Sequence, residues 1–191
     1  MSPEGKPVKL WYRFRGMLMA PPLVLCLLST HFECEIDLLV FPLAGTLFAT
    51  GLLLRVWAQM HLHYRLKVHK VMTTSGPYAY VRNPIYIANT LILAGCVAMS
   101  ELIWFVPVML IWCAFIYSMV VRYEESHLIE KYGEQYAEYL KRVPRWWPAF
   151  LRPGLKGRSS RATRYLFPSI LAEAHNLLFL LPFIAKELIH E

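Results

Sequence analysis

Long apolar stretches separated by short polar ones run through most of the chain. A helix that crosses a bilayer needs about 20 consecutive apolar residues. Four stretches approach that length: residues 17–32, 36–58, 85–99 and 102–121. The pattern therefore predicts an all-α integral membrane protein. Pro21 and Pro22 interrupt the first stretch, which predicts a helix that is kinked or that begins at these prolines.

A fifth apolar stretch covers residues 165–184 and contains polar side chains near its middle: Glu173, His175 and Asn176. Ionisable groups at the centre of a bilayer are costly and usually face a partner or a cavity. We expect a membrane-surface or re-entrant helix here, with a fifth transmembrane helix as the alternative. The fold class is therefore a bundle of four to five transmembrane helices.

The segment 122–143 has the spacing of an amphipathic helix. Apolar and aromatic residues recur every three or four positions: Leu128, Tyr132, Tyr136, Tyr139 and Val143. Glu124 and Glu125 precede this stripe by about one turn, so both carboxylates point along the buried face. The alternative is an ordinary helix start, where acidic residues interact favourably with the helix dipole. The fourth span is expected to run on into this segment, which argues against such a start.

The segment 75–86 combines turn residues with polar ones at the entrance to a predicted span. Gly76 and Pro77 indicate a turn, and Asn83 precedes a proline, which disfavours helix. Irregular backbone at membrane depth is tolerated where it is buried in protein or lines a wet cavity. Arg82 and Asn83 are therefore expected to face a polar pocket. The alternative is an interfacial belt made of Tyr78, Tyr80 and Tyr86.

Composition and charge agree with a membrane protein. The 191 residues are 57% hydrophobic and 17% charged, whereas soluble domains are about 25% charged. A disordered chain is excluded, and the net charge of +7 is better suited to anionic lipid headgroups than to nucleic acid. Basic residues cluster before the first span and in segments 59–83 and 122–164, so positive-inside asymmetry predicts a cytoplasmic N-terminus.

Other chemistry is not indicated by the remaining candidates. The four cysteines show no C-x-x-C spacing, and His61 and His63 point to different sides of a helix, so no metal site is predicted. Cys34 and Cys96 both fall near the predicted outer face, and whether they pair stays open. Residues 1–154 are expected to form one membrane-embedded core. Residues 155–191 are expected to form a basic linker and a membrane-associated helix.

Taken together, the two polar segments resemble the isoprenylcysteine carboxyl methyltransferases and the phospholipid (phosphatidylethanolamine) N-methyltransferases. That family carries G-P-Y-x-x-V-R-[HN]-P-x-Y, two spans, and then E-E-x-x-L, Y-G-x-x-Y-x-x-Y and V-P-R. The corresponding residues here are 76–86, 124–128, 132–139 and 143–145. The resemblance covers about residues 40–150. Asn83 replaces the commoner histidine, as in the phospholipid branch, and Ala88 stands where the family often has glycine.

The resemblance implies S-adenosyl-L-methionine as methyl donor, in a cytoplasmic pocket capped by the amphipathic helix. It implies donor-binding roles for Gly76, Pro77, Tyr78, Asn83, Tyr86, Glu124, Glu125 and Tyr136. It implies catalytic or positioning roles for Arg82, Asn83, Tyr86 and Arg145. The glutamates would accept hydrogen bonds from ribose hydroxyls or the ammonium group, and one of the arginines would bind a carboxylate or an anionic headgroup. Tyr86, Tyr136 or Tyr139 would face the sulfonium.

The implied function is methyl transfer to a lipid or lipophilic acceptor at the cytoplasmic face of a membrane, either the bacterial inner membrane or the endoplasmic reticulum. One alternative is an NADPH-dependent membrane reductase of the sterol type, which shares an R-H-P-x-Y segment. The other is a non-catalytic membrane adaptor. The presence of Glu124 and Glu125 in place of the arginine–aspartate pair of the reductases favours the methyltransferase. The atom that accepts the methyl group, the acceptor itself and the oligomeric state stay open.

Overall fold

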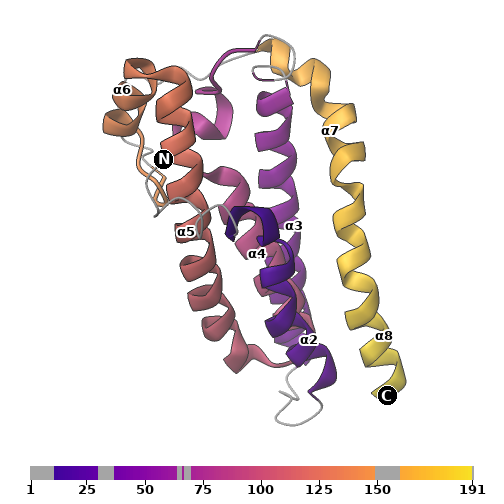
Figure 1. The fold of residues 1–191 in the computed structure, drawn as a ribbon. Coiled ribbons are helices and arrows are strands. Elements are labelled where there is room, and N and C mark those ends of the chain that lie inside the picture. Colours follow the sequence, from indigo (N-terminus) through magenta and orange to yellow (C-terminus); the bar gives the residue numbers. More distant parts are fainter. Residues whose placement is uncertain (1–10, 30–36, 64–65, 67–69, 149–159, 191) are drawn as a thin grey trace.

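The computed structural model describes residues 11–29, 37–63, 66, 70–148 and 160–190. All regular structure in these residues is helical, as predicted (Figure 1). The α-helices are α2 (Ala20–Leu28), α3 (Asp37–Leu62), α4 (Pro84–Met99), α5 (Val106–Tyr132), α6 (Glu134–Arg142), α7 (Leu166–Glu173) and α8 (Leu180–His190). The 3-10 segments are η1 (Met17–Met19), η3 (Gly76–Ala79), η4 (Ile103–Phe105), η5 (Ser160–Tyr165) and η6 (Ala174–Phe179). Cys34 lies outside the described residues.

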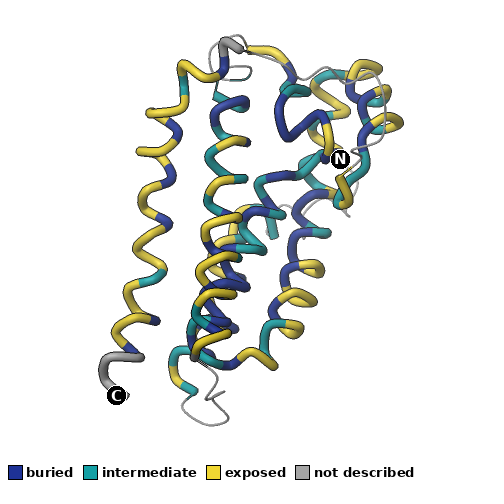
Figure 2. Tube along the Cα trace, turned by 180° about the vertical axis from the view of Figure 1, so that it is seen from behind, coloured by how far each residue is buried: buried dark blue, intermediate teal, exposed yellow. Residues whose placement is uncertain are grey.

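Three helical segments are long and apolar enough to cross a membrane: Leu38–Leu62, Ile103–Tyr132 and Ala162–Lys186. Their outward faces are largely exposed in the isolated chain, while the buried positions face the other helices (Figure 2). A lipid-facing helix has this appearance because hydrocarbon tails take the place of a protein partner. The first two segments overlap the predicted spans at 36–58 and 102–121, and by length and composition they are candidates for crossing a membrane.

The first and third predicted spans are shorter helices in the structure. α2 begins at Ala20, so Pro21 falls in its first turn, where a missing N–H costs nothing; this confirms a helix that starts at the prolines. α4 has 16 residues, and most of them are buried between α3 and α5. α4 is therefore the central helix of the bundle rather than a lipid-facing one.

The C-terminal helices form the third candidate segment, which by length and composition suits the alternative of a fifth span. α7 packs on α3, and α8 packs on α4 and α2. Two of the three polar residues that argued against a span face inward: Glu173 and Asn176 are buried, at 1% and 4% exposure. His175 is exposed, with its Nδ1 2.7 Å from the Ala172 carbonyl oxygen. Because Glu173 and Asn176 have partners inside the bundle, the remaining apolar surface is free to contact lipid.

The fourth predicted span runs on into the amphipathic segment, as expected, because α5 continues without interruption to Tyr132. The amphipathic helix predicted over residues 122–143 is not one helix, however, but is divided between α5 and α6. The break comes at Gly133, where φ is +55°, a conformation that costs glycine little and most other residues more. α6 then turns back toward the start of α4, with buried Tyr136 and Tyr139 on its inner face.

Glycines allow α3 and α4 to pack closely. A Cβ added to Gly51 of α3 would lie 2.8 Å from the Ala88 carbonyl oxygen of α4. A Cβ added to Gly95 of α4 would lie 2.8 Å from the Phe48 nitrogen of α3. Small residues at helix contacts let backbones approach in this way. Gly45, on the same helix as Gly51, faces open space instead.

Replacing Gly51 by leucine is therefore expected to destabilise the protein by at least about 2 kcal/mol, because the contacting atoms include backbone that cannot move aside. Thermal unfolding of the detergent-purified protein measures the effect. Gly45→Leu, on the same helix with no neighbour within 4 Å, is the control and should leave the midpoint nearly unchanged. Equal midpoints for the two variants would contradict this packing.

Candidate functional site

The elbow, residues 75–84, leads into the start of α4. Gly76 has φ +62°, and a Cβ at this position would lie 2.4 Å from the His61 ring of α3. His61 Nδ1 lies 2.9 Å from Ser75 Oγ. The tight turn predicted from Gly76 and Pro77 is thus held against the end of α3, and only glycine fits there.

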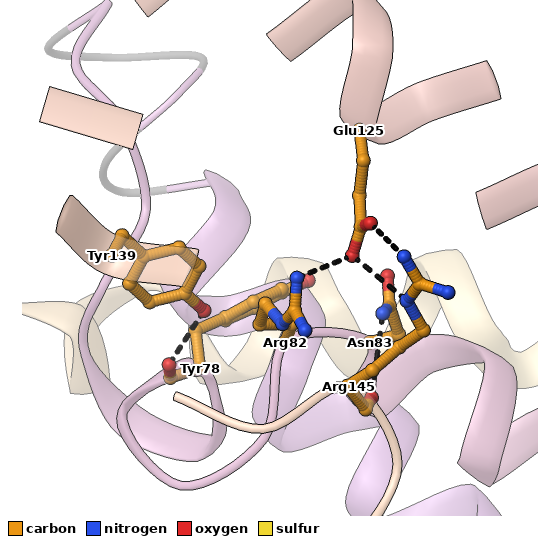
Figure 3. Close-up of polar contacts among 6 residues, drawn as sticks. All are labelled: Tyr78, Arg82, Asn83, Glu125, Tyr139 and Arg145. Atoms are coloured by element: carbon orange, nitrogen blue, oxygen red, sulfur yellow. Dashed lines mark hydrogen bonds and ion pairs between the residues drawn. The ribbon is translucent and has the colours of Figure 1, made fainter. Parts of the chain in front are cut away.

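Glu125 of α5 joins two arginines that come from other parts of the chain (Figure 3). Arg82 Nη1 of the elbow donates to its carboxylate at 2.8 Å. Arg145, in the segment after α6, donates to both carboxylate oxygens through Nε and Nη2. Glu125 is 6% exposed. A buried carboxylate with two guanidinium partners is saturated with charge-assisted hydrogen bonds, so its contacts are to the protein.

The backbone reinforces this arrangement. The Arg82 backbone N–H donates to the Pro144 carbonyl at 2.9 Å. Asn83 Nδ2 donates to the Arg145 carbonyl at 3.3 Å (Figure 3). The elbow and the Val143–Pro144–Arg145 segment therefore lie side by side beneath the ends of α4 and α5. Because the Asn83 amide already has a protein partner, it serves here to position backbone.

Glu124 has a different environment from its neighbour. The Tyr86 hydroxyl of α4 donates to it at 2.8 Å, and Glu124 lines the main cavity described below. The Tyr86 ring also packs against Tyr117 of α5, with centroids 4.8 Å apart. Of the two adjacent carboxylates, Glu124 is the one without an arginine partner among the described residues.

α6 covers the elbow from the aqueous side. The Tyr139 hydroxyl donates to the Tyr78 carbonyl at 2.7 Å (Figure 3). Burial raises the pKa of Tyr139 and of Tyr136 above the usual value for tyrosine, so both hydroxyls stay protonated near neutral pH. The amphipathic stripe predicted from residues 128–143 is therefore the surface that packs on the site.

A cavity of about 640 Å³ lies between α3, α4, α5, α6 and the elbow. We call it the main cavity. Its volume is that of a typical small-molecule pocket. Four buried side-chain polar atoms in the described residues have no hydrogen-bond partner, and three of them belong to cavity-lining residues: Thr73 Oγ1, Arg82 Nε and Tyr132 Oη. Orphaned buried polar atoms are rare and call for a partner. The cavity thus offers unfilled bonds to a polar ligand.

Most of the residues singled out from the sequence meet at this cavity. Its walls include eight of them: Tyr78, Arg82, Asn83, Tyr86, Glu124, Glu125, Tyr136 and Tyr139. Arg145 is connected to the cavity wall by its ion pair with Glu125. Gly76 and Pro77 form the turn of the elbow.

Sequence reasoning missed Arg55 and Gln59 of α3 and Asn89 of α4, which also line the main cavity. Arg55 carried a usable signal, because an ionisable residue inside an apolar helix usually faces a polar site. No three His, Cys, Asp or Glu side chains in the described residues are grouped so as to hold a metal ion.

Residues 40–135, about half of the chain, match the phospholipid methyltransferase family. The chain belongs to this family. The matched region contains α4, α5 and the elbow, and hence the Arg82–Glu125 pair and the Tyr86–Glu124 bond.

Two curated relatives are similar over part of their length. The cobalt-zinc-cadmium resistance protein of Cupriavidus metallidurans is 34% identical over 113 residues, which cover 57% of this chain and 51% of that protein. The nickel-cobalt-cadmium resistance protein of Alcaligenes xylosoxydans xylosoxydans is 30% identical over 94 residues, covering 49% of this chain and 43% of that protein. The chain thus spans about half the length of the curated relatives it matches. No solved structure matches the chain.

Proposed function

We propose that this protein transfers a methyl group from S-adenosyl-L-methionine to a lipophilic acceptor at the cytoplasmic face of a membrane. The observation that carries the proposal is the convergence of the elbow and the two glutamates on one cavity, within the region that matches the family. The positive-inside charge pattern supports a cytoplasmic N-terminus and active site. The family match and the relatives do not favour the reductase or the adaptor.

The residues around the main cavity fit the proposed donor. Glu124 supplies a carboxylate for ribose hydroxyls or an ammonium group, and the orphaned Thr73 and Tyr132 hydroxyls supply further hydrogen bonds. Tyr86 and Tyr136 supply aromatic faces suited to a sulfonium. The donor, when bound, supplies an electrophilic methyl group. Glu125 is proposed as a positioning residue, because both of its oxygens are engaged by arginines.

The protein contributes alignment and exclusion of water rather than a strong base. Asn83 cannot take up a proton, and its amide already donates to the Arg145 carbonyl. α6 is anchored to the elbow by the Tyr139–Tyr78 bond and shields the cavity from the aqueous side. Holding two reactants in line, in a site without water, accounts for large rate accelerations in group transfer.

A second cavity of about 390 Å³ supports a lipophilic acceptor. It lies between α4 and α5, close to Trp146 and Trp147, and its walls are mainly apolar. Tyr117 lines this second cavity and Tyr86 lines the main cavity, and their two rings are in contact. The two cavities thus meet at a pair of tyrosines. We infer that the hydrocarbon part of the acceptor occupies the second cavity, with its reacting group beside the tyrosine pair.

Replacing Glu124 by glutamine is expected to weaken binding of S-adenosylhomocysteine, the demethylated donor, by about tenfold. Glutamine keeps the shape and the Tyr86 contact, but it loses a charge-assisted hydrogen bond to the ligand. Calorimetry on the detergent-purified protein measures the affinity. Glu138→Gln, at an exposed position of α6, is the control and should bind like the wild type; equal affinities for both variants would contradict the role of Glu124.

The activity itself is tested with a radiolabelled methyl group. Wild-type protein in detergent, mixed with labelled S-adenosyl-L-methionine and a total lipid extract, should yield label in the organic phase. S-adenosylhomocysteine should raise the unfolding temperature, whereas NADPH should leave it unchanged. No transfer and a stabilising effect of NADPH alone would point to the reductase. No transfer and no response to either ligand would point to the adaptor.

A further inference from the structure

Arg55 lies inside α3, seven residues before its end, and its side chain lines the main cavity. At 1.5 Å per residue this is about 10 Å from the end of the helix. We propose that Arg55 binds an anionic oxygen group, a carboxylate or a phosphate, of a ligand in the main cavity, and that Glu173 of α7 is the positioning residue for Arg55. The inference rests on the proposed function and adds to it a binding group and a role for the C-terminal helices.

The Arg55 side chain is fixed from two directions. Its Nε donates to Glu173 of α7, and its Nη1 donates to the side-chain oxygen of Asn89 of α4. Glu173 is in turn held by Asn176, whose Nδ2 donates to its Oε2 at 2.7 Å and to its carbonyl at 2.9 Å. Three helices therefore set the direction of one guanidinium group, which is the kind of support that a binding group requires.

Spare donors remain on the same group. A guanidinium carries five N–H donors, and the structure gives protein partners to two of its nitrogens within the described residues. The Arg55 side chain is 17% exposed, whereas that of Glu173 is 2% exposed. Glu173 is thus sealed between helices while Arg55 keeps contact with the cavity. The remaining donors are suited to two oxygens of one anionic group.

Charge around the cavity favours an anion. Arg15, Arg55 and Arg82 line it together with Glu124 and Glu125, and Arg145 and Glu173 are paired to members of that set. Four arginines thus face three glutamates, which leaves one positive charge unbalanced. The neighbours of Arg55 in the cavity wall include Gln59 and Asn89, which are neutral. A carboxylate or phosphate entering here would complete the balance.

A purely structural role explains this pair poorly. Burying an ion pair in a bundle is costly, and apolar residues of similar size usually pack as well or better. Elsewhere on the same C-terminal helices, Lys186 of α8 is buried and its Nζ donates to the Ser100 carbonyl of the core at 3.2 Å. That contact joins the C-terminal helices to the core and involves no residue of the main cavity. It therefore supplies a control for structural damage.

The experiment compares two variants with wild type. The double variant Arg55→Gln, Glu173→Gln removes both charges, so neither charge is left buried without its partner. The single variant Glu173→Gln keeps Arg55 but removes the charge that holds its side chain in place. Lys186→Met is the control. Each purified full-length protein is titrated with S-adenosylhomocysteine and with its decarboxylated analogue. Each is also assayed for methyl transfer at rising concentrations of one total lipid extract, and values are scaled to the folded fraction.

A fall of about tenfold or more in affinity for S-adenosylhomocysteine, with no change for the decarboxylated analogue, would assign Arg55 to the donor carboxylate. Unchanged donor affinity with an apparent KM for the lipid extract raised about tenfold would assign it to the acceptor. In both cases Glu173→Gln should shift the same constant by less, and Lys186→Met should shift neither. If the double variant and the single variant Glu173→Gln both keep the wild-type affinity for S-adenosylhomocysteine and the wild-type KM for the lipid extract, the inference is wrong. Absence of donor binding and transfer by the wild type would instead refute the proposed function.

Discussion

Replacing Glu125 by alanine is expected to lower kcat/KM for methyl transfer by roughly a hundredfold. The substitution leaves Arg82 and Arg145 side by side without their shared carboxylate. Removing one partner of a buried ion pair lowers stability by about 3 kcal/mol. A rise of the same size in the activation free energy, because the site is no longer ordered, corresponds to a fall of roughly a hundredfold in rate. Kinetic assays with labelled donor, together with thermal unfolding, measure the two effects.

The matched control is Glu130→Ala on the same helix. The Glu130 side chain is 86% exposed and lies 4.0 Å from His127, and exposed pairs of this kind contribute little to stability. This variant should keep wild-type kinetics and unfolding temperature. A Glu125→Ala protein with normal turnover would show that the three-residue cluster does not organise the site.

Replacing Gly76 by alanine is expected to have the second largest effect. The new Cβ would lie between 2.4 and 2.6 Å from three atoms of the His61 ring, and φ is +62°. The left-handed backbone costs alanine about 1 kcal/mol, and displacement of the ring or the elbow adds to it. We expect a loss of about 3 kcal/mol in stability and a large loss of donor binding, as measured by thermal unfolding and calorimetry.

Two further variants separate these causes. Gly133→Ala also places a side chain at positive φ, at +55°, but nothing lies within 4 Å of its Cβ. It should destabilise less and leave donor binding largely intact. The double variant Gly76→Ala with His61→Ala removes the contact and should recover part of the loss, which a double-mutant cycle quantifies. A Gly76→Ala protein as stable as wild type would contradict the tight fit of the elbow.

The sequence allowed the convergence of the site to be predicted because of a simple topological rule. α4 and α5 form a hairpin, so the residues before α4 and those at the end of α5 lie at the same end of the bundle. This brings Arg82 to Glu125 and Tyr86 to Glu124, across 43 and 38 residues of chain. The lengths of the apolar stretches that form α3 and α5 could also be predicted from the sequence, because bilayer thickness fixes how long such a stretch must be.

The lateral arrangement of the helices was not predictable in the same way. Arg55 and Glu173 are 118 residues apart, and helical periodicity does not say which neighbour the C-terminal helices choose. For that reason the charge in residues 165–184 favoured a surface placement, although the structure satisfies it against α3. The break inside the amphipathic segment was not predictable either: the stripe of residues 128–143 indicated one helix, whereas the backbone breaks at Gly133.

The contact between Tyr86 and Tyr117 has a consequence for the order of events in a catalytic cycle. The main cavity is covered by α6 on its aqueous side, and the second cavity lies along α5 beside exposed apolar side chains such as Leu110. A water-soluble reactant would then enter the main cavity past α6, and a bilayer-dissolved reactant would enter the second cavity from the lipid beside α5. Under the proposed function, neither reactant has to leave before the other enters, so both would be bound together, with the reacting group of the acceptor reaching the methyl group of the donor beside the contact between the two rings.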